Sequence, residues 1–150
     1  MANKDQFDVN KIQYFHIRDL GFDYLIPDDV LLPQGQREAI QFSLKIVKTL
    51  GVDDKIIRLF ITIELKTGGK NNKEATASYA TEHLFKVENL DALIKKVGDS
   101  FEVDSILDNT ITGLAYSTVR GLLYQKFSGT WFSNFILPIT KPADLEESTE

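Results

Sequence analysis

The period-two pattern of apolar residues over residues 57–65 constrains the fold of this chain more than any other feature. Apolar side chains occupy every odd position there: Ile57, Leu59, Ile61, Ile63 and Leu65. Because side chains two residues apart on a strand point to the same face, this pattern predicts a strand with one covered and one polar face. Residues 40–46 alternate in the same way, and the odd positions of residues 75–87 are mostly apolar. Turn-rich links at residues 50–54 and 67–72 separate the three strands, which predicts an antiparallel meander.

A fourth strand is expected near the N-terminus. The run YFHIRDL at residues 14–20 has a mixed pattern that suits a short strand better than a helix. Gly21 interrupts this run, and residues 22–30 are expected to continue in an extended conformation. Pro27 and Pro33 argue against a helix across this region. The sheet is therefore predicted to have four strands.

One amphipathic helix is predicted to follow the strands. Ile111, Ala115, Val119 and Leu122 lie three and four residues apart, which places them on one helix face. Asp108 or Asn109 is expected to cap this helix, and Asn89 to cap a short helical turn over residues 89–96. Strands first and a helix afterwards indicate an α+β fold, with the long helix packed on one face of a four-stranded antiparallel sheet.

Length and composition predict a single globular domain over residues 1–150, with disordered tails at residues 1–10 and 143–150. The hydrophobic fraction is 43% and the charged fraction 26%, which is ordinary for a folded domain. The net charge of −5 argues against a nucleic-acid partner, since phosphate binding requires an excess of Lys and Arg. No window reaches the ~20 apolar residues of a membrane span, so no membrane insertion is expected. The absence of cysteine is compatible with a cytoplasmic location.

No constellation of residues predicts catalysis, a metal or a cofactor. The two histidines, His16 and His83, have no carboxylate at a metal-binding spacing. Residues 67–70 (TGGK) lack the pattern and the following helix of a phosphate-binding loop. The acidic pairs at residues 28–29 and 53–54 lie in turn-rich segments, where carboxylates are usually solvated. The chain is therefore predicted not to be an enzyme.

Aromatic and aliphatic residues exceed what one helix on one sheet can cover. Residues 131–137 contain five large apolar groups and no charge, in what is expected to be an extended run. Such an excess predicts a surface that binds another subunit or an unfolded chain. The predicted peptide-contact residues are Tyr14, Phe15, Phe22, Tyr24, Trp131, Phe132 and Phe135, and Leu114 and Leu122 are predicted to pack subunits together. Substituting Trp131 or Phe132 by Ala is expected to weaken protection of clients and leave the fold intact.

With these residues in view, the chain resembles the SecB family of bacterial export chaperones. Residues 15–23 (FHIRDLGFD) are similar to the family's opening strand, and residues 75–90 (ATASYATEHLFKVENL) to its third strand. Residues 115–138 look like its main helix with the Gly-Thr and Leu-Pro positions that follow it. The likeness covers roughly residues 11–142 in the correct order.

The resemblance implies an ATP-independent chaperone that holds unfolded or preprotein chains for export and translocation. It implies a homo-oligomer, a dimer or a dimer of dimers, and the export motor ATPase SecA as a further partner. Family members continue past Leu-Pro into a second helix, whereas this chain ends soon afterwards in ADLEESTE, and residues 101–108 lack the family's Cys-Pro approach. A SecB-like guardian of an antitoxin-type partner is therefore a second hypothesis. A third is an oligomeric domain that binds a small ligand or substrate between helix and sheet, and a fourth is a purely structural subunit.

Overall fold

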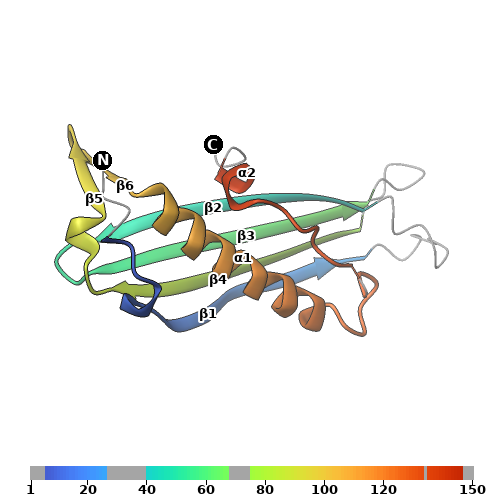
Figure 1. The fold of residues 1–150 in the computed structure, drawn as a ribbon. Helices are drawn as coiled ribbons and strands as arrows, with labels where there is room; N and C mark the ends of the chain where they lie inside the picture. The colour runs from blue at the N-terminus through green and yellow to red at the C-terminus, as the bar shows by residue number, and fades with distance from the viewer. Residues whose placement is uncertain (1–5, 27–39, 68–74, 134, 147–150) are drawn as a thin grey trace.

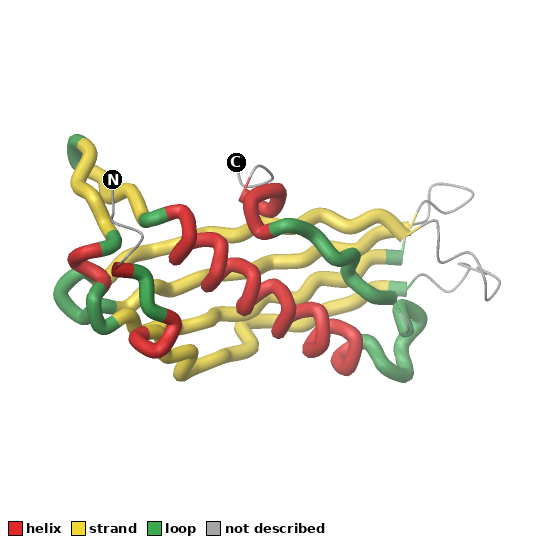
Figure 2. Tube along the Cα trace, viewed as in Figure 1, coloured by secondary structure: helices red, strands yellow, loops and turns green. Residues whose placement is uncertain are grey.

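A long helix lies diagonally across one face of a four-stranded antiparallel sheet, and a small hairpin projects beyond one end of that sheet (Figures 1 and 2). The computed structural model describes residues 6–26, 40–67, 75–133 and 135–146. The predicted α+β class, the four antiparallel strands and the single long helix are confirmed.

The sheet has the order β1-β4-β3-β2. Its strands are β1 (Ile12–Leu25), β2 (Ile40–Gly51), β3 (Ile56–Thr67) and β4 (Thr76–Val87). The expected meander holds for β2, β3 and β4, whereas β1 pairs with β4 rather than with β2. The two edge strands of this sheet are therefore β1 and β2.

Strand β1 is continuous where an interruption at Gly21 was expected. Its pairing with β4 shifts register between Tyr14 and His16 and again between Asp19 and Gly21. A β-bulge of this kind accommodates an extra residue without ending the strand, which explains the mixed apolar pattern of the sequence. Three parts of the sequence-based prediction lie outside the described residues. They are the extended conformation of residues 27–30, Pro33, and most of the turn at residues 67–72.

The core lies between the sheet and helix α1 (Ser105–Lys126). On β3 and β4 the alternate residues that face the helix are almost completely buried. They include the five odd-numbered apolar residues from Ile57 to Leu65 whose spacing predicted β3. Helix α1 meets them with a stripe of buried residues: Leu107, Ile111, Thr112, Ala115, Tyr116, Val119 and Leu123. The two amphipathic elements thus bury each other's apolar faces.

Helix α1 begins at Ser105, earlier than the predicted caps at Asp108 or Asn109. The Asp104 carboxylate accepts hydrogen bonds from the backbone amides of Ile106 (3.1 Å) and Leu107 (3.3 Å), so Asp104 is the N-cap. Asp108 lies instead in the first turn, where its negative charge is favourable.

The helical turn expected over residues 89–96 is shorter than predicted, because a β-hairpin begins at Ile94. Only Leu90–Ala92 forms a 3₁₀ turn, and the Asn89 side chain does not cap it. Strands β5 (Ile94–Val97) and β6 (Ser100–Val103) then pair around Gly98, whose φ of 64° favours glycine. Each strand of the hairpin has only four residues, which is too short for an alternation of apolar and polar residues to predict it.

The chain after α1 is not the extended strand-like run that was expected. Residues 131–133 form a turn, and residues 135–141 run irregularly on the same side of the sheet as α1 (Figure 2). Two helix side chains hold this segment, since the Tyr116 hydroxyl donates to the Pro138 carbonyl (2.6 Å) and Arg120 Nε donates to the Leu137 carbonyl (2.9 Å). Phe132 and Leu137 are consequently part of the core.

The predicted tails are partly structured. Helix α2 (Pro142–Glu146) packs against α1 and β2 with Leu145 buried, in a region expected to be loose. A Cβ at Gly113 would lie 3.2 Å from Pro142 Cγ, so glycine permits the close approach of α1 and α2. At the other end, a 3₁₀ turn covers Val9–Lys11 and is capped by Asp8. Residues 1–5 and 147–150 lie outside the described residues.

Replacing Phe132 by Ala is expected to destabilise the fold by about 3–5 kcal/mol, because it removes a fully buried ring from the core. Urea unfolding followed by circular dichroism measures the loss. Ile139→Ala is the control, since Ile139 is 88% exposed and its substitution is expected to leave the unfolding midpoint unchanged. Equal stability of the two variants would contradict the placement of Phe132.

Candidate polypeptide-binding surface

The nine predicted contact residues fall into three groups by exposure. Phe15, Tyr24 and Leu114 are exposed, as a contact surface requires. Tyr14, Phe22, Trp131, Phe135 and Leu122 are half-buried and pack against the core. Phe132 is fully buried, so the structure does not offer it as a contact residue, and the expectation that its loss leaves the fold intact is corrected.

Rings from β1 and from the segment after α1 meet in one aromatic cluster. The Phe22 and Phe127 ring centroids are 5.1 Å apart, and Phe127 contacts Phe132 at 5.7 Å. Trp131 stands edge-on to Phe132 at 5.0 Å. These two aromatic-rich segments therefore cover each other in part, and Phe22 and Trp131 lie at the border of the core.

Tyr14 is oriented by a buried histidine. Its ring stacks on Phe85 with centroids 4.2 Å apart, and its hydroxyl is hydrogen-bonded to His83 Nδ1. The other ring nitrogen of His83 is 2.8 Å from the Thr81 hydroxyl. Burial lowers the pKa of His83 to about 4, an effect that the nearby Glu82 carboxylate partly opposes. His83 is therefore a neutral core residue that fixes β1 onto β4.

A second polar contact ties β1 to α1. The Asp19 carboxylate accepts a hydrogen bond from the Tyr79 hydroxyl (2.6 Å) and pairs with Lys126 Nζ (2.9 Å) at the end of the helix. The Tyr79 hydrogen bond and Lys126 together lower the pKa of Asp19. Burial and the neighbouring Asp19 raise the pKa of Tyr79. These groups have structural partners, which explains their shifts without a catalytic role.

Edge strand β1 exposes a row of apolar side chains. Phe15, Ile17, Leu20, Tyr24 and Leu25 are each at least 42% exposed. Ile17 and Leu20 were not predicted as contact residues. The mixed order of apolar and polar residues in this strand does not show which side chains become exposed at its β-bulges. On α1, Leu114 and Tyr124 also face outward, whereas Leu122 is half-buried. These residues form a surface suited to a second subunit.

The other edge strand borders a groove, here called the β2 groove, with a volume of about 560 Å³. Its apolar wall comes from Ile46 and Leu50 of β2 and from Ile111 of α1, and hairpin strand β6 supplies Phe101 and Val103. Lys48 and Asp108 form an ion pair of 2.5 Å at its border. No pattern in the sequence indicated this groove, because the hairpin that forms one side was not predicted.

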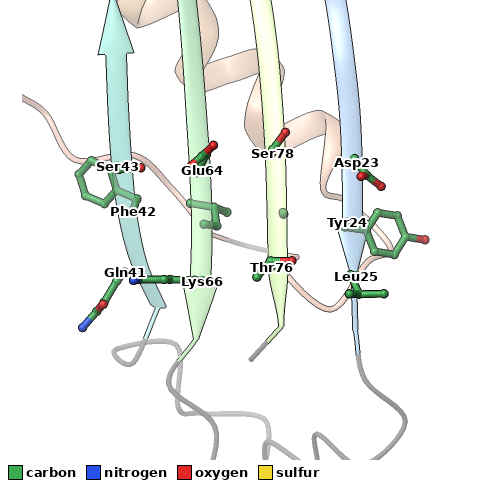
Figure 3. Close-up of a pocket in the computed structure, with 12 residues that line it drawn as sticks. Asp23, Tyr24, Leu25, Gln41, Phe42, Ser43, Glu64, Lys66, Thr76 and Ser78 are labelled. Carbon is green, nitrogen blue, oxygen red and sulfur yellow. The ribbon is translucent and has the colours of Figure 1, made fainter. Parts of the chain in front are cut away.

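A separate hollow of about 450 Å³ crosses the ends of all four strands (Figure 3). Asp23, Ser43, Glu64 and Ser78 point toward the viewer there while α1 lies behind the sheet, so these side chains occupy the face that α1 does not cover. Phe42 and Tyr24 flank the hollow. Polar and apolar residues together line this hollow, as they do the β2 groove.

The interior between α1 and the sheet is filled by its own side chains. Residues on both sides of this interface, such as Leu59, Ile61, Ala115 and Val119, are at most 1% exposed. The hollow that both α1 and the sheet line is the β2 groove at the border of this interface. The described residues contain no group of three or more side chains that could hold a metal ion. No helix in the described part of the chain is long and apolar enough to cross a membrane.

Comparison with solved structures identifies the fold. The chain is similar to the SecB-like chaperone Rv1957 of Mycobacterium tuberculosis, solved with a ChAD peptide from the Rv1956 HigA1 antitoxin, with a TM-score of 0.56 and 17% identity over 87% of this chain and 91% of that one. A protein of unknown function from Streptococcus agalactiae matches with a TM-score of 0.41 and 9% identity over 85% of this chain and 97% of that one, too distant to support an argument. No family model and no curated protein sequence matches the chain. The fold is SecB-like.

The stability of the protein is expected to fall as the pH decreases from about 6.5 to about 4. The unfolded chain protonates its histidine near pH 6.5, whereas folded His83 stays neutral until about pH 4, so protons favour the unfolded state in this window. Urea unfolding at half-unit pH intervals measures the effect, and His83→Gln is expected to flatten the pH dependence above pH 4. His16→Gln is the control and should show the same decrease in stability with falling pH as the wild type. The same decrease in His83→Gln would contradict the role of His83 in this pH dependence. Asp19, with its lowered pKa, adds a further loss only at lower pH.

Proposed function

We propose that this protein is an ATP-independent chaperone or adaptor of the cytoplasm that holds extended, non-native polypeptide segments. The observation that supports it most directly is the β2 groove, a partly apolar hollow that borders an edge strand of the described sheet.

An unfolded segment offers two kinds of group that this site matches. Its backbone N–H and C=O groups can pair with the outward-facing backbone of β2, since alternate residues of an edge strand have no ladder partner on that side. Its apolar side chains can enter the groove between Leu50, Ile111 and Phe101. Backbone pairing accepts many sequences, and the apolar groove selects for segments that a folded protein would bury.

The comparison supports a polypeptide partner. The SecB-like chaperone of Mycobacterium tuberculosis was solved with a peptide from an antitoxin, and the present chain has a similar fold. Between preprotein export and the guarding of an antitoxin-type partner, that complex favours the second. Binding to SecA is accordingly not required by this proposal.

Self-association uses the opposite edge of the sheet. The exposed row of Phe15, Ile17 and Leu20 on β1 and the outward-facing Leu114 and Tyr124 of α1 would be covered by a second copy. The β2 groove then stays open in the assembly, because β1 and β2 lie at opposite edges of the sheet.

Substituting Phe101 by Ser is expected to weaken the binding of an unfolded, fluorescein-labelled peptide about tenfold and to reduce protection of reduced insulin chains from aggregation. Phe101 lines the groove and is 42% exposed, so its loss should not unfold the protein. Val97→Ser is the matched control, because Val97 is 49% exposed on the same hairpin and does not line the groove. Unchanged affinity of Phe101→Ser would refute the groove as the binding site.

Placing a charge on the β1 row, with Ile17→Lys and Leu20→Lys combined, is expected to convert the protein to a monomer. Burying an unpaired ammonium in an apolar interface is strongly unfavourable. Light scattering coupled to gel filtration gives the mass. Asp53→Lys is the control, since Asp53 lies in the exposed turn between β2 and β3 and should leave the mass unchanged. An oligomer that persists in the double variant would place the interface elsewhere.

A further inference from the structure

The sheet face opposite α1 is an open surface with its own chemistry. Figure 3 shows Ser43, Glu64 and Ser78 pointing away from the helix on neighbouring strands. Two side chains of one strand lie on the same face of the sheet when an even number of positions separates them. The centre of this face therefore carries Lys45 and Val47 from β2, Arg58 and Phe60 from β3, and Glu82, Leu84 and Lys86 from β4.

Basic side chains dominate the centre of this face in a protein whose net charge is −5. They are Lys45, Arg58, Lys86 and, from β1, Arg18. The one carboxylate among them, Glu82, is only 5% exposed, and its Oε2 pairs with Arg18 Nη2 at 3.3 Å and with Arg58 Nε at 3.8 Å. At the strand ends Asp23 and Glu64 lie near Lys66. Arg18 and Arg58 thus pair with one buried carboxylate, and Lys45 and Lys86 add two further cations to the same face.

Glu82 orients the two arginines and leaves most of their donors available. An arginine guanidinium has five N–H donors in a planar fork. Each arginine uses one nitrogen in its pair with Glu82, and the side chains of Arg18 and Arg58 are 59% and 48% exposed. Their remaining N–H groups are therefore presented to solvent beside Glu82, which suits the planar carboxylates of Asp and Glu side chains.

Apolar side chains lie between these cations. Val47, Phe60 and Glu82 are in register across three strands, and Leu84 is next to Arg58. Val47 is 42% exposed, while Phe60 and Leu84 are half-buried. Apolar side chains set among basic ones form a surface for a partner that combines acidic and apolar residues.

We infer that this basic face, defined by Arg18, Lys45, Arg58, Lys86, Val47 and Phe60, docks an acidic segment of a partner protein with apolar residues among its carboxylates. Charge complementarity selects this occupant. Nucleic acid fits less well, because the buried Glu82 and the overall charge of −5 repel a polyphosphate. A second copy would have to present an acidic patch of matching shape. The inference is independent of the proposed chaperone function, since the β2 groove lies on the helix side of the sheet.

The test uses two 12-residue, fluorescein-labelled peptides in which Leu alternates with Glu in one and with Lys in the other. We expect fluorescence anisotropy to show binding of the Glu peptide, weaker binding at high salt, and no binding of the Lys peptide. The Lys45→Glu/Lys86→Glu variant should lose at least tenfold in affinity. The matched control is Lys95→Glu/Lys96→Glu on the hairpin, which changes the net charge equally away from this face. Thermal unfolding of both double variants establishes that they fold.

Several outcomes would overturn the inference. Equal weakening by both double variants would mean that net charge alone attracts the peptide, or that it binds near the hairpin. Competition by a 20-nucleotide single-stranded RNA as strong as that by the unlabelled Glu peptide would favour nucleic acid. A change of oligomeric mass in Lys45→Glu/Lys86→Glu would place a second copy on the face. Because Phe101→Ser is expected to bind the Glu peptide normally, loss of binding in that variant would mean that the peptide occupies the β2 groove.

Discussion

Packing of α1 on one face of β3 and β4 determines which surfaces of this protein stay open. The buried stripe from Leu107 to Leu123 covers the inner residues of these two central strands, where the interface is almost completely excluded from water. One helix of this length cannot cover four strands of twelve or more residues on both faces. Both edge strands and the outer face are therefore left with exposed side chains and, at the edges, with unpaired backbone groups.

Polar contacts attach β1 to this core where apolar packing is incomplete. Tyr14 with His83, and Asp19 with Tyr79 and Lys126, connect the bulged strand to β4 and to the end of the helix. Most residues of β1 are exposed, so these contacts and the backbone ladder with β4, more than burial, fix the position of the strand. The apolar row on its edge can then remain available to a second copy without loosening the sheet.

The three open surfaces differ chemically, and this difference allows them to act separately. The β1 edge is apolar and suits self-association, and the β2 groove combines an apolar wall with an open backbone edge. The outer face carries basic side chains with apolar ones among them. A SecB-like chaperone that holds a client at one edge and docks a partner on the outer face would bring the two together. The hairpin β5–β6 is important in this arrangement, because its residues Phe101 and Val103 line the β2 groove.

The amino-acid sequence by itself determined the sheet and the helix. Alternation at Ile57 to Leu65 and the three-four spacing from Ile111 to Val119 are local patterns, and each depends only on the geometry of its own element. The tertiary structure decided the rest: that β1 pairs with β4, that Phe132 is buried while Phe15 is exposed, and that Phe101 meets Leu50 in a groove. These outcomes depend on contacts between residues far apart in the chain. Hydrophobicity predicts that an aromatic ring will be covered, but only the packing of the other elements decides whether the chain itself or a partner covers it.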